Sequence, residues 1–190
     1  ALLQDYIPRN SKSFYEKRND EIYAIQLPFD DFKIGSPVSL SKGMYNYNLL
    51  NKLLAHVRYQ DDFSKLPIPF FCIATDVVSG DAIMLESGNL PQSILASGAF
   101  PSLYTPVEIG DKLLIDGGVV NNYPVDEIRK KGIDVVIGVD VQDGKKDRQN
   151  IKGALDILMQ IANYGMYGGM EEKIKQTDIY IKPDITNFSV

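Results

Sequence analysis

Apolar residues occur along the chain in short blocks whose spacing alternates between strand-like and helix-like. Residues 45–58 predict a helix, because five apolar side chains recur at the helical period and fall on one face: Leu49, Leu50, Leu53, Leu54 and Val57. Residues 68–78 follow a proline and are almost continuously apolar, which is typical of a strand covered on both faces. We therefore expect an amphipathic helix followed by a buried strand.

The rest of the chain continues this alternation. Glycines and prolines separate the apolar blocks, as expected where helices and strands begin and end. The pattern predicts strands over residues 21–27 (weak), 81–86, 112–115, 134–141 and 179–183, and helices over 91–97, 124–132 and 151–175.

The order of these elements indicates the fold class. Strand 112–115, helix 124–132 and strand 134–141 have the spacing of a βαβ unit, in which the two strands are parallel. Helices alternating with strands make a layered α/β protein. We expect one domain with a mainly parallel sheet, since 190 residues suit a single domain.

Composition and charge exclude some partners. Hydrophobic residues make up 44% of the chain and charged residues 24%, which are ordinary values for a globular protein. The net charge is −5 and the 20 lysines and arginines are scattered, so we expect no nucleic acid, which needs clustered positive charge. The single cysteine, Cys72, excludes an internal disulfide.

The strongest candidate for chemistry is Asp116, followed by Gly117 and Gly118. It stands at the end of an apolar strand, and ligands of open parallel sheets bind outside the carboxyl ends of the strands. The plain alternative is a strand-ending turn, because Asp-Gly is among the commonest turn pairs. The tripeptide alone does not decide between the two.

The motifs around Asp116 add a specific order. Upstream lie Ala96-Ser97-Gly98-Ala99-Phe100-Pro101 and Pro106-Val107, and downstream lies Gly118-Val-Val-Asn-Asn-Tyr-Pro124. Phe71-Cys-Ile-Ala-Thr-Asp76 and Asp134-Val-Val-Ile-Gly-Val-Asp140 are the buried strands before and after them. With the stretch from Ser41 to Leu54, this set resembles the patatin-like phospholipase family over essentially the whole chain.

The resemblance implies a three-layer α/β/α fold and a Ser–Asp dyad acting on phospholipid or another acyl ester, without metal or cofactor. Asp116 would then be the general base, which needs to lie about 2.6–3.2 Å from the serine hydroxyl and works best when burial raises its pKa. Gly117 and Gly118 would permit the turn. Four apolar residues would line the acyl pocket: Leu95, Ala99, Phe100 and Leu103.

The chain departs from the family in its nucleophile. None of its twelve serines has glycine at both −2 and +2, as the Gly-x-Ser-x-Gly elbow requires. We expect the chain, residues 1–190, to be the C-terminal portion of one patatin-like domain and inert alone, with the serine contributed by sequence before Ala1. The alternative is a non-catalytic patatin-like module that binds lipid or a partner.

Other reactive residues have structural interpretations. Ser39-Leu-Ser-Lys42 has the acylation spacing of penicillin-recognising enzymes but lacks their companion motifs. His56 lies at the edge of the leucine stripe, Cys72 lies within the most apolar strand, and Ser97 and Ser102 would shape the pocket or cap backbone. Asp116, Asp140 and Asp143 could suggest a metal cluster, but strand ends and turns favour aspartate anyway.

Two expectations concern partners and compartment. Without the central nucleophile strand, residues 68–78 would have an unpaired edge, so we expect self-association or pairing with the missing N-terminal segment. Peripheral membrane contact fits a lipid substrate, although an overall acidic chain gains no help at anionic membranes. The ending Thr177-Asp-Ile-Tyr-Ile-Lys-Pro-Asp184, then Phe188-Ser189, looks most like bacterial members with an outer-membrane export module; a cytoplasmic parent is the alternative.

Overall fold

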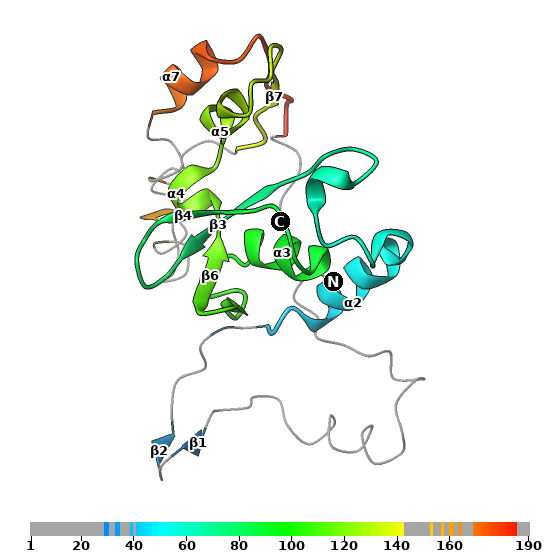
Figure 1. Cartoon of the computed structure of the whole chain (residues 1–190). Helices are drawn as coiled ribbons and strands as arrows, with labels where there is room; N and C mark the ends of the chain where they lie inside the picture. Colours follow the sequence, from blue (N-terminus) through cyan, green and yellow to red (C-terminus); the bar gives the residue numbers. More distant parts are fainter. Residues whose placement is uncertain are drawn as a thin grey trace.

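The computed structural model describes residues 29–30, 33–34, 39, 41–142, 153, 157, 160–161, 164 and 169–185 (Figure 1). The weak strand expected over residues 21–27 lies outside this part of the chain. A small antiparallel pair joins β1 (Phe29–Asp30) to β2 (Lys33–Ile34). The described contacts that position Asp116 lie within residues 41–142.

The main sheet has four strands in the order β4-β3-β6-β5. Its strands are β3 (Cys72–Asp76), β4 (Ala82–Leu85), β5 (Val107–Ile109) and β6 (Lys112–Asp116). All three pairings are antiparallel, so the expectation of a mainly parallel sheet is wrong. Connection length accounts for two of the pairings, β3–β4 and β5–β6: residues 77–81 and 110–111 are hairpin loops, and loops this short join antiparallel strands.

The first hairpin turn is built on a buried aspartate. The Asp76 carboxylate accepts hydrogen bonds from the Val78 amide at 3.1 Å and the Ser79 hydroxyl at 3.3 Å. Gly80 follows with φ +77°, a left-handed conformation that a side chain rarely adopts. Lys112 of β6 places its Nζ 3.9 Å from the same carboxylate. Asp76 therefore holds the β3–β4 turn and ties it to the neighbouring strand.

Strand β3 lies inside the sheet, not at an edge. It pairs with β4 along residues 72–75 and with β6 along residues 74–76. The unpaired edge that we expected for residues 68–78 is therefore absent at residues 74–76, whereas Cys72 and Ile73 pair with β4 alone among the described strands. Self-association itself stays a prediction.

Two helices lie on one flank of this sheet, as Figure 1 shows for α2 and α3. Helix α3 (Leu90–Ser97) begins with Asn89, whose side chain accepts from the Gln92 amide, and ends at Gly98 as expected. It packs its small residue Ala96 onto a core made with Ala74, Leu85 and Leu114. Helix α2 (Met44–Leu53) continues into the 3₁₀ turn η2 (Ala55–Val57) and lies against α3.

The second half adds a small parallel pair. Strand β7 (Ile137–Val139) pairs with β8 (Ile179–Ile181), whereas the expected βαβ unit would have placed β7 parallel to β6. Between β6 and β7 lie the short helices α4 (Gly118–Asn121) and α5 (Val125–Lys130). The remaining short elements are η3 (Phe63–Lys65) and α7 (Met170–Lys175).

The helix expected over residues 151–175 is not continuous at its end. Helix α7 begins at Met170 because Gly169 has φ +72°, which a continuing α-helix cannot contain. Most of residues 151–168 lie outside the described part of the chain. In the described part, no helix combines the length and apolar character needed to cross a membrane.

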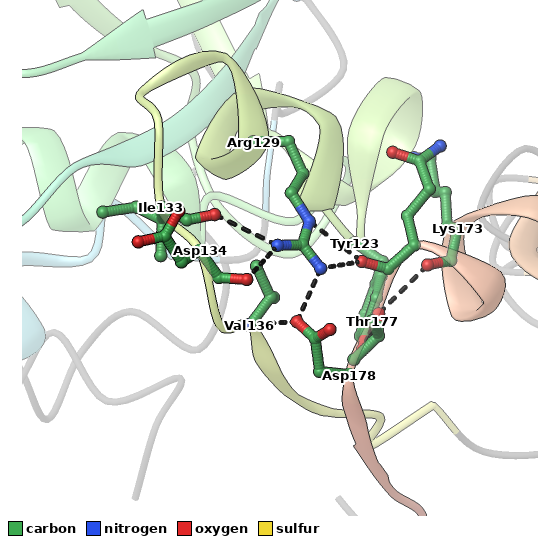
Figure 2. A network of polar contacts seen from close by, with 9 residues as sticks. Tyr123, Arg129, Ile133, Asp134, Val136, Lys173, Thr177 and Asp178 are labelled. Carbon is green, nitrogen blue, oxygen red and sulfur yellow. Dashed lines mark hydrogen bonds and ion pairs between the residues drawn. The ribbon is translucent and has the colours of Figure 1, made fainter.

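Arg129 joins α5 to the segment that leads into β8 (Figure 2). Its guanidinium donates to the carbonyl oxygens of Ile133 at 3.0 Å and Asp134 at 2.7 Å, and its Nη2 donates to Gln176 at 2.7 Å. The same nitrogen lies 2.6 Å from Oδ2 of Asp178, which also accepts from the Val136 amide. Arg129 therefore fixes the position of β7 and β8 against α5.

We expect Arg129→Met to lower the free energy of unfolding by about 2 kcal/mol, because several carbonyl oxygens lose a charged donor. The ion pair with Asp178 contributes little of this, since both side chains are partly exposed. Thermal or urea unfolding measures the loss. Lys130→Met is the matched control, because Lys130 is the next residue of α5 and its side chain is 70% exposed in its ion pair with Glu127. Equal losses in the two variants would contradict the assigned role.

Candidate active site

The backbone of Asp116 is fixed from two sides. Its amide donates to the carbonyl of Ala99 at 3.0 Å, in the loop that follows α3. Its own carbonyl accepts from the hydroxyl of Thr75 at 2.9 Å, on the adjacent strand β3. The end of β6 is therefore held between its neighbouring strand and the end of α3, as a catalytic side chain requires.

The Asp116 carboxyl group is half-buried at this strand end. Its Oδ1 accepts from the amide of Gly118 at 2.8 Å. Burial raises the pKa of Asp116 above its ordinary value, and the hydrogen bond from Gly118 offsets part of that shift. No side chain of the described residues donates a hydrogen bond to this carboxylate. Asp116 is thus a carboxylate of raised pKa whose one hydrogen-bond donor is a backbone amide.

Gly117 is required by a close approach of two backbones. Its φ is −65°, which any residue adopts, so a left-handed conformation is not the reason for glycine. A Cβ on this residue would lie 2.1 Å from the carbonyl oxygen of Ile73 on β3. Its amide also donates to the carbonyl of Ser97 at 3.3 Å. We expected the glycine pair to permit a turn. At Gly117 the structure shows a packing role instead, because glycine lets the chain after Asp116 lie directly against β3.

The four residues predicted to line the acyl pocket surround the end of α3. Ala99 is fully buried and its carbonyl holds the Asp116 amide. Leu95 is half-buried beside Gly43, and Phe100 is half-buried with its carbonyl accepting from the Leu103 amide at 3.2 Å. The structure places Ala99 directly at Asp116 and does not test the pocket role of the other three.

A surface cavity of about 320 Å³ lies elsewhere, beside the end of η2. It is lined by His56, Val57, Tyr59, Gln60, Lys65, Leu66 and Pro67. None of the four predicted pocket residues contributes to it, so it is a separate feature of the surface.

The other reactive side chains have structural partners. Cys72 donates from its thiol to the carbonyl of Ser93 at 3.4 Å, and burial raises the pKa of Cys72 to about 11. His56 is exposed, with Nδ1 3.1 Å from the carbonyl oxygen of Leu53. Asp140 receives hydrogen bonds from the Tyr180 hydroxyl at 2.7 Å and the Gln142 amide at 2.9 Å. None of them lies in a nucleophile–base pair within the described residues.

Two features of the site were missed from the sequence. The Thr75 hydroxyl bonds to the Asp116 carbonyl, and its only signal was a hydroxyl residue in an otherwise apolar strand. Ser102 has φ +69°, a conformation rare outside glycine, in the loop that connects α3 to β5. Backbone strain of this kind leaves no mark that a single sequence can show.

We expect Gly117→Ala to destabilise the fold by about 3 kcal/mol, because the new methyl group meets backbone of β3 that cannot move aside cheaply. Chemical denaturation measures this loss. Gly98→Ala serves as the control: its Cβ would meet only the Ile94 carbonyl oxygen at 3.7 Å, an ordinary contact. A Gly117→Ala variant as stable as the control would show that the approach is not a constraint.

A second expectation concerns pH. The folded-state pKa of Asp116 is raised, so its ionisation opposes folding once pH rises above the unfolded-state pKa near 4. Asp116→Asn should therefore raise the melting temperature at pH 7, and the gain should shrink as pH falls toward 4. Asp76→Asn should instead lower it, because Asp76 loses its ion pair with Lys112. A gain from Asp116→Asn that is the same at both pH values would overturn this account.

Comparisons with known proteins identify the family of this chain. The patatin-like phospholipase family matches residues 1–129. An uncharacterised NTE family protein of Mycobacterium tuberculosis is 32% identical over 116 residues, covering 60% of this chain and 19% of its own length. The lysophospholipase NTE1 of Scheffersomyces stipitis is 28% identical over 149 residues, covering 64% of this chain and 10% of its own. The chain thus spans a fifth or less of these relatives, and it belongs to the patatin-like phospholipase family.

Proposed function

We propose that this chain is the base-bearing part of a serine-type lipid acyl hydrolase, with Asp116 as the general base. The observation that carries the proposal is the Asp116 carboxylate itself: half-buried, raised in pKa, and held at a strand end by the Gly118 amide. A carboxylate that only closed a turn would gain nothing from a raised pKa. A base that removes a proton from a weakly acidic hydroxyl does gain from it.

The chemistry assigned to Asp116 is the same in two half-reactions. The carboxylate first takes the proton of a serine hydroxyl as the serine oxygen attacks the ester carbonyl, and then gives it to the departing alcohol oxygen. In the second half, it takes a proton from water as the water oxygen attacks the acyl-serine, and gives that proton to the serine oxygen as the fatty acid leaves. Each half-reaction thus moves one proton through the same carboxylate and returns it unprotonated.

The serine is proposed to come from sequence outside residues 1–190, since no serine of the chain has the elbow spacing. Geometry supports this division. Within the described residues, the carboxylate has a backbone partner and no side-chain hydroxyl donor. The backbone of Asp116 is already fixed by its hydrogen bonds to Ala99 and Thr75, so an added segment need not reshape the site.

The substrate class is proposed from the family and its relatives. A relative named as a lysophospholipase matches across 64% of the chain, which supports a phospholipid or lysophospholipid acyl ester. Leu95, Phe100 and Leu103 are proposed to supply the apolar area that an acyl chain requires, since they are half-buried apolar residues in α3 and the loop whose Ala99 bonds to Asp116. No step in this proposal needs a metal ion.

The test uses the natural protein that contains this chain. A fluorophosphonate probe should label that protein and leave the 190-residue chain unlabelled. In the protein, Asp116→Asn should reduce kcat on a lysophospholipid by roughly three orders of magnitude with KM little changed, because proton transfer is lost and binding is kept.

Asp111→Asn is the matched control, because Asp111 is an exposed aspartate at the other end of β6, in the hairpin loop. Its activity should equal that of the unmodified protein. Near-normal turnover of Asp116→Asn, in a protein that the probe does label, would refute the role of the carboxylate. A natural protein that neither binds the probe nor hydrolyses lipid would favour the alternative, a non-catalytic lipid- or partner-binding module.

A further inference from the structure

The charges of this acidic chain are unevenly distributed. Residues 32–60 contain no aspartate or glutamate and carry four positive charges, Lys33, Lys42, Lys52 and Arg58, which leaves −9 for the remaining 161 residues of a chain with net charge −5. Residues 87–107, which include α3 and the loop after it, contain no charged residue at all. Because α2 lies against α3, the two acid-free segments meet in space (Figure 1).

Helix α2 is apolar on both of its long faces. Leu50, and Leu54 directly after the helix, are half-buried. Tyr45, Leu49 and Leu53 recur every four residues, so they form one stripe, and the exposed fractions of Leu49 and Leu53 are 41% and 61%. The sequence pattern predicted all of these leucines on one core-facing side. The structure instead leaves two of them on the surface.

The exposed stripe carries its own positive charge. Lys52 stands on the same side of the helix, because it follows Tyr45 by seven residues, or about two turns. Arg58 stacks on the ring of Tyr59 at 4.5 Å from its centre, and Tyr59 is 82% exposed. Leucine, tyrosine and basic residues together on an exposed helix are the pattern of a helix that lies in a membrane interface.

We propose that the α2 face, defined as Tyr45, Leu49, Lys52, Leu53, Arg58 and Tyr59, docks this protein onto an anionic lipid surface. Charge complementarity selects this occupant: basic side chains meet lipid phosphates while the leucines enter the acyl boundary and the tyrosine rings lie at head-group depth.

Docking through the α2 face does not depend on the role of Asp116, so it is tested without turnover. The 190-residue chain should bind vesicles of phosphatidylglycerol and phosphatidylcholine, and bind vesicles of phosphatidylcholine alone at least tenfold more weakly. High salt should weaken the binding, because it screens the basic residues. Lys52→Gln should reduce the partition coefficient about fivefold, and Leu53→Ser should reduce it about tenfold.

Matched controls keep the test specific. Lys175 is an exposed lysine in the last turn of α7, as Lys52 is in the last turn of α2, and Val78 is an exposed apolar residue of the β3–β4 turn. Lys175→Gln and Val78→Ser should bind as the unmodified chain does. The chain contains no tryptophan, so Tyr59→Trp places a single reporter on the α2 face. Its emission should shift to shorter wavelength on anionic vesicles, and that of Val78→Trp should not.

Four results would overturn the proposal: no vesicle binding, equal binding to neutral vesicles, equal losses in the test and control variants, or a reporter at residue 59 that stays in water. A dimer in light scattering that Lys52→Gln dissociates would also overturn it and assign the α2 face to a second copy of the chain. Circular dichroism of each variant separates a lost surface from a lost fold. If vesicles bind as expected while Asp116→Asn leaves hydrolysis intact, the docking surface stands and the proposed catalytic role falls.

Discussion

The approach of Gly117 to the Ile73 carbonyl is the constraint on which the rest of the site depends. A side chain there would need space 2.1 Å from backbone, so the segment after β6 can lie on β3 only because residue 117 is glycine. That seating lets the Gly117 amide reach Ser97 and the Asp116 amide reach Ala99. It therefore brings the end of α3 and the end of β6 together, and Asp116 emerges between them.

This arrangement has an energetic cost that falls on the aspartate. Its backbone is fully engaged, but its carboxylate receives one hydrogen bond, from the Gly118 amide. Asp76 lies on β3, two residues beyond Ala74, which pairs with Asp116. Its carboxylate has more partners: it accepts hydrogen bonds from an amide and a hydroxyl and lies near a lysine. The carboxylate of Asp76 therefore has three partners where that of Asp116 has one. This difference in partners is the basis on which we propose a chemical role for Asp116 and assign a structural one to Asp76.

Much of the fold could be predicted from local sequence, because helix and strand periods, proline and glycine act over a few residues. The helix closed by Gly98 and the strand before Asp116 are confirmed. Strand direction depends on pairing over long range, and the apolar character of residues 68–78 suggested a mainly parallel sheet, which is wrong. The five-residue loop between β3 and β4 was the better guide. For the site, Asp116 was visible as a motif, but Thr75 and the reason for Gly117 depend on contacts 41 and 44 residues apart in sequence, which no local pattern encodes.

Net charge has the same limitation as local sequence, because a total for the whole chain does not show where the charged residues lie in the fold. A net charge of −5 argued against help from an anionic membrane, yet the acidic residues are absent from residues 32–60 and from 87–107, and the fold places α2 beside α3. Helix periodicity also predicted that every leucine of α2 faces the core, although Leu49 and Leu53 are exposed in the structure. The surplus leucines lie on the surface with the surplus positive charge. A helix that was only structural would need neither, so the coincidence of the two on one face is what distinguishes a docking surface from an incompletely buried helix.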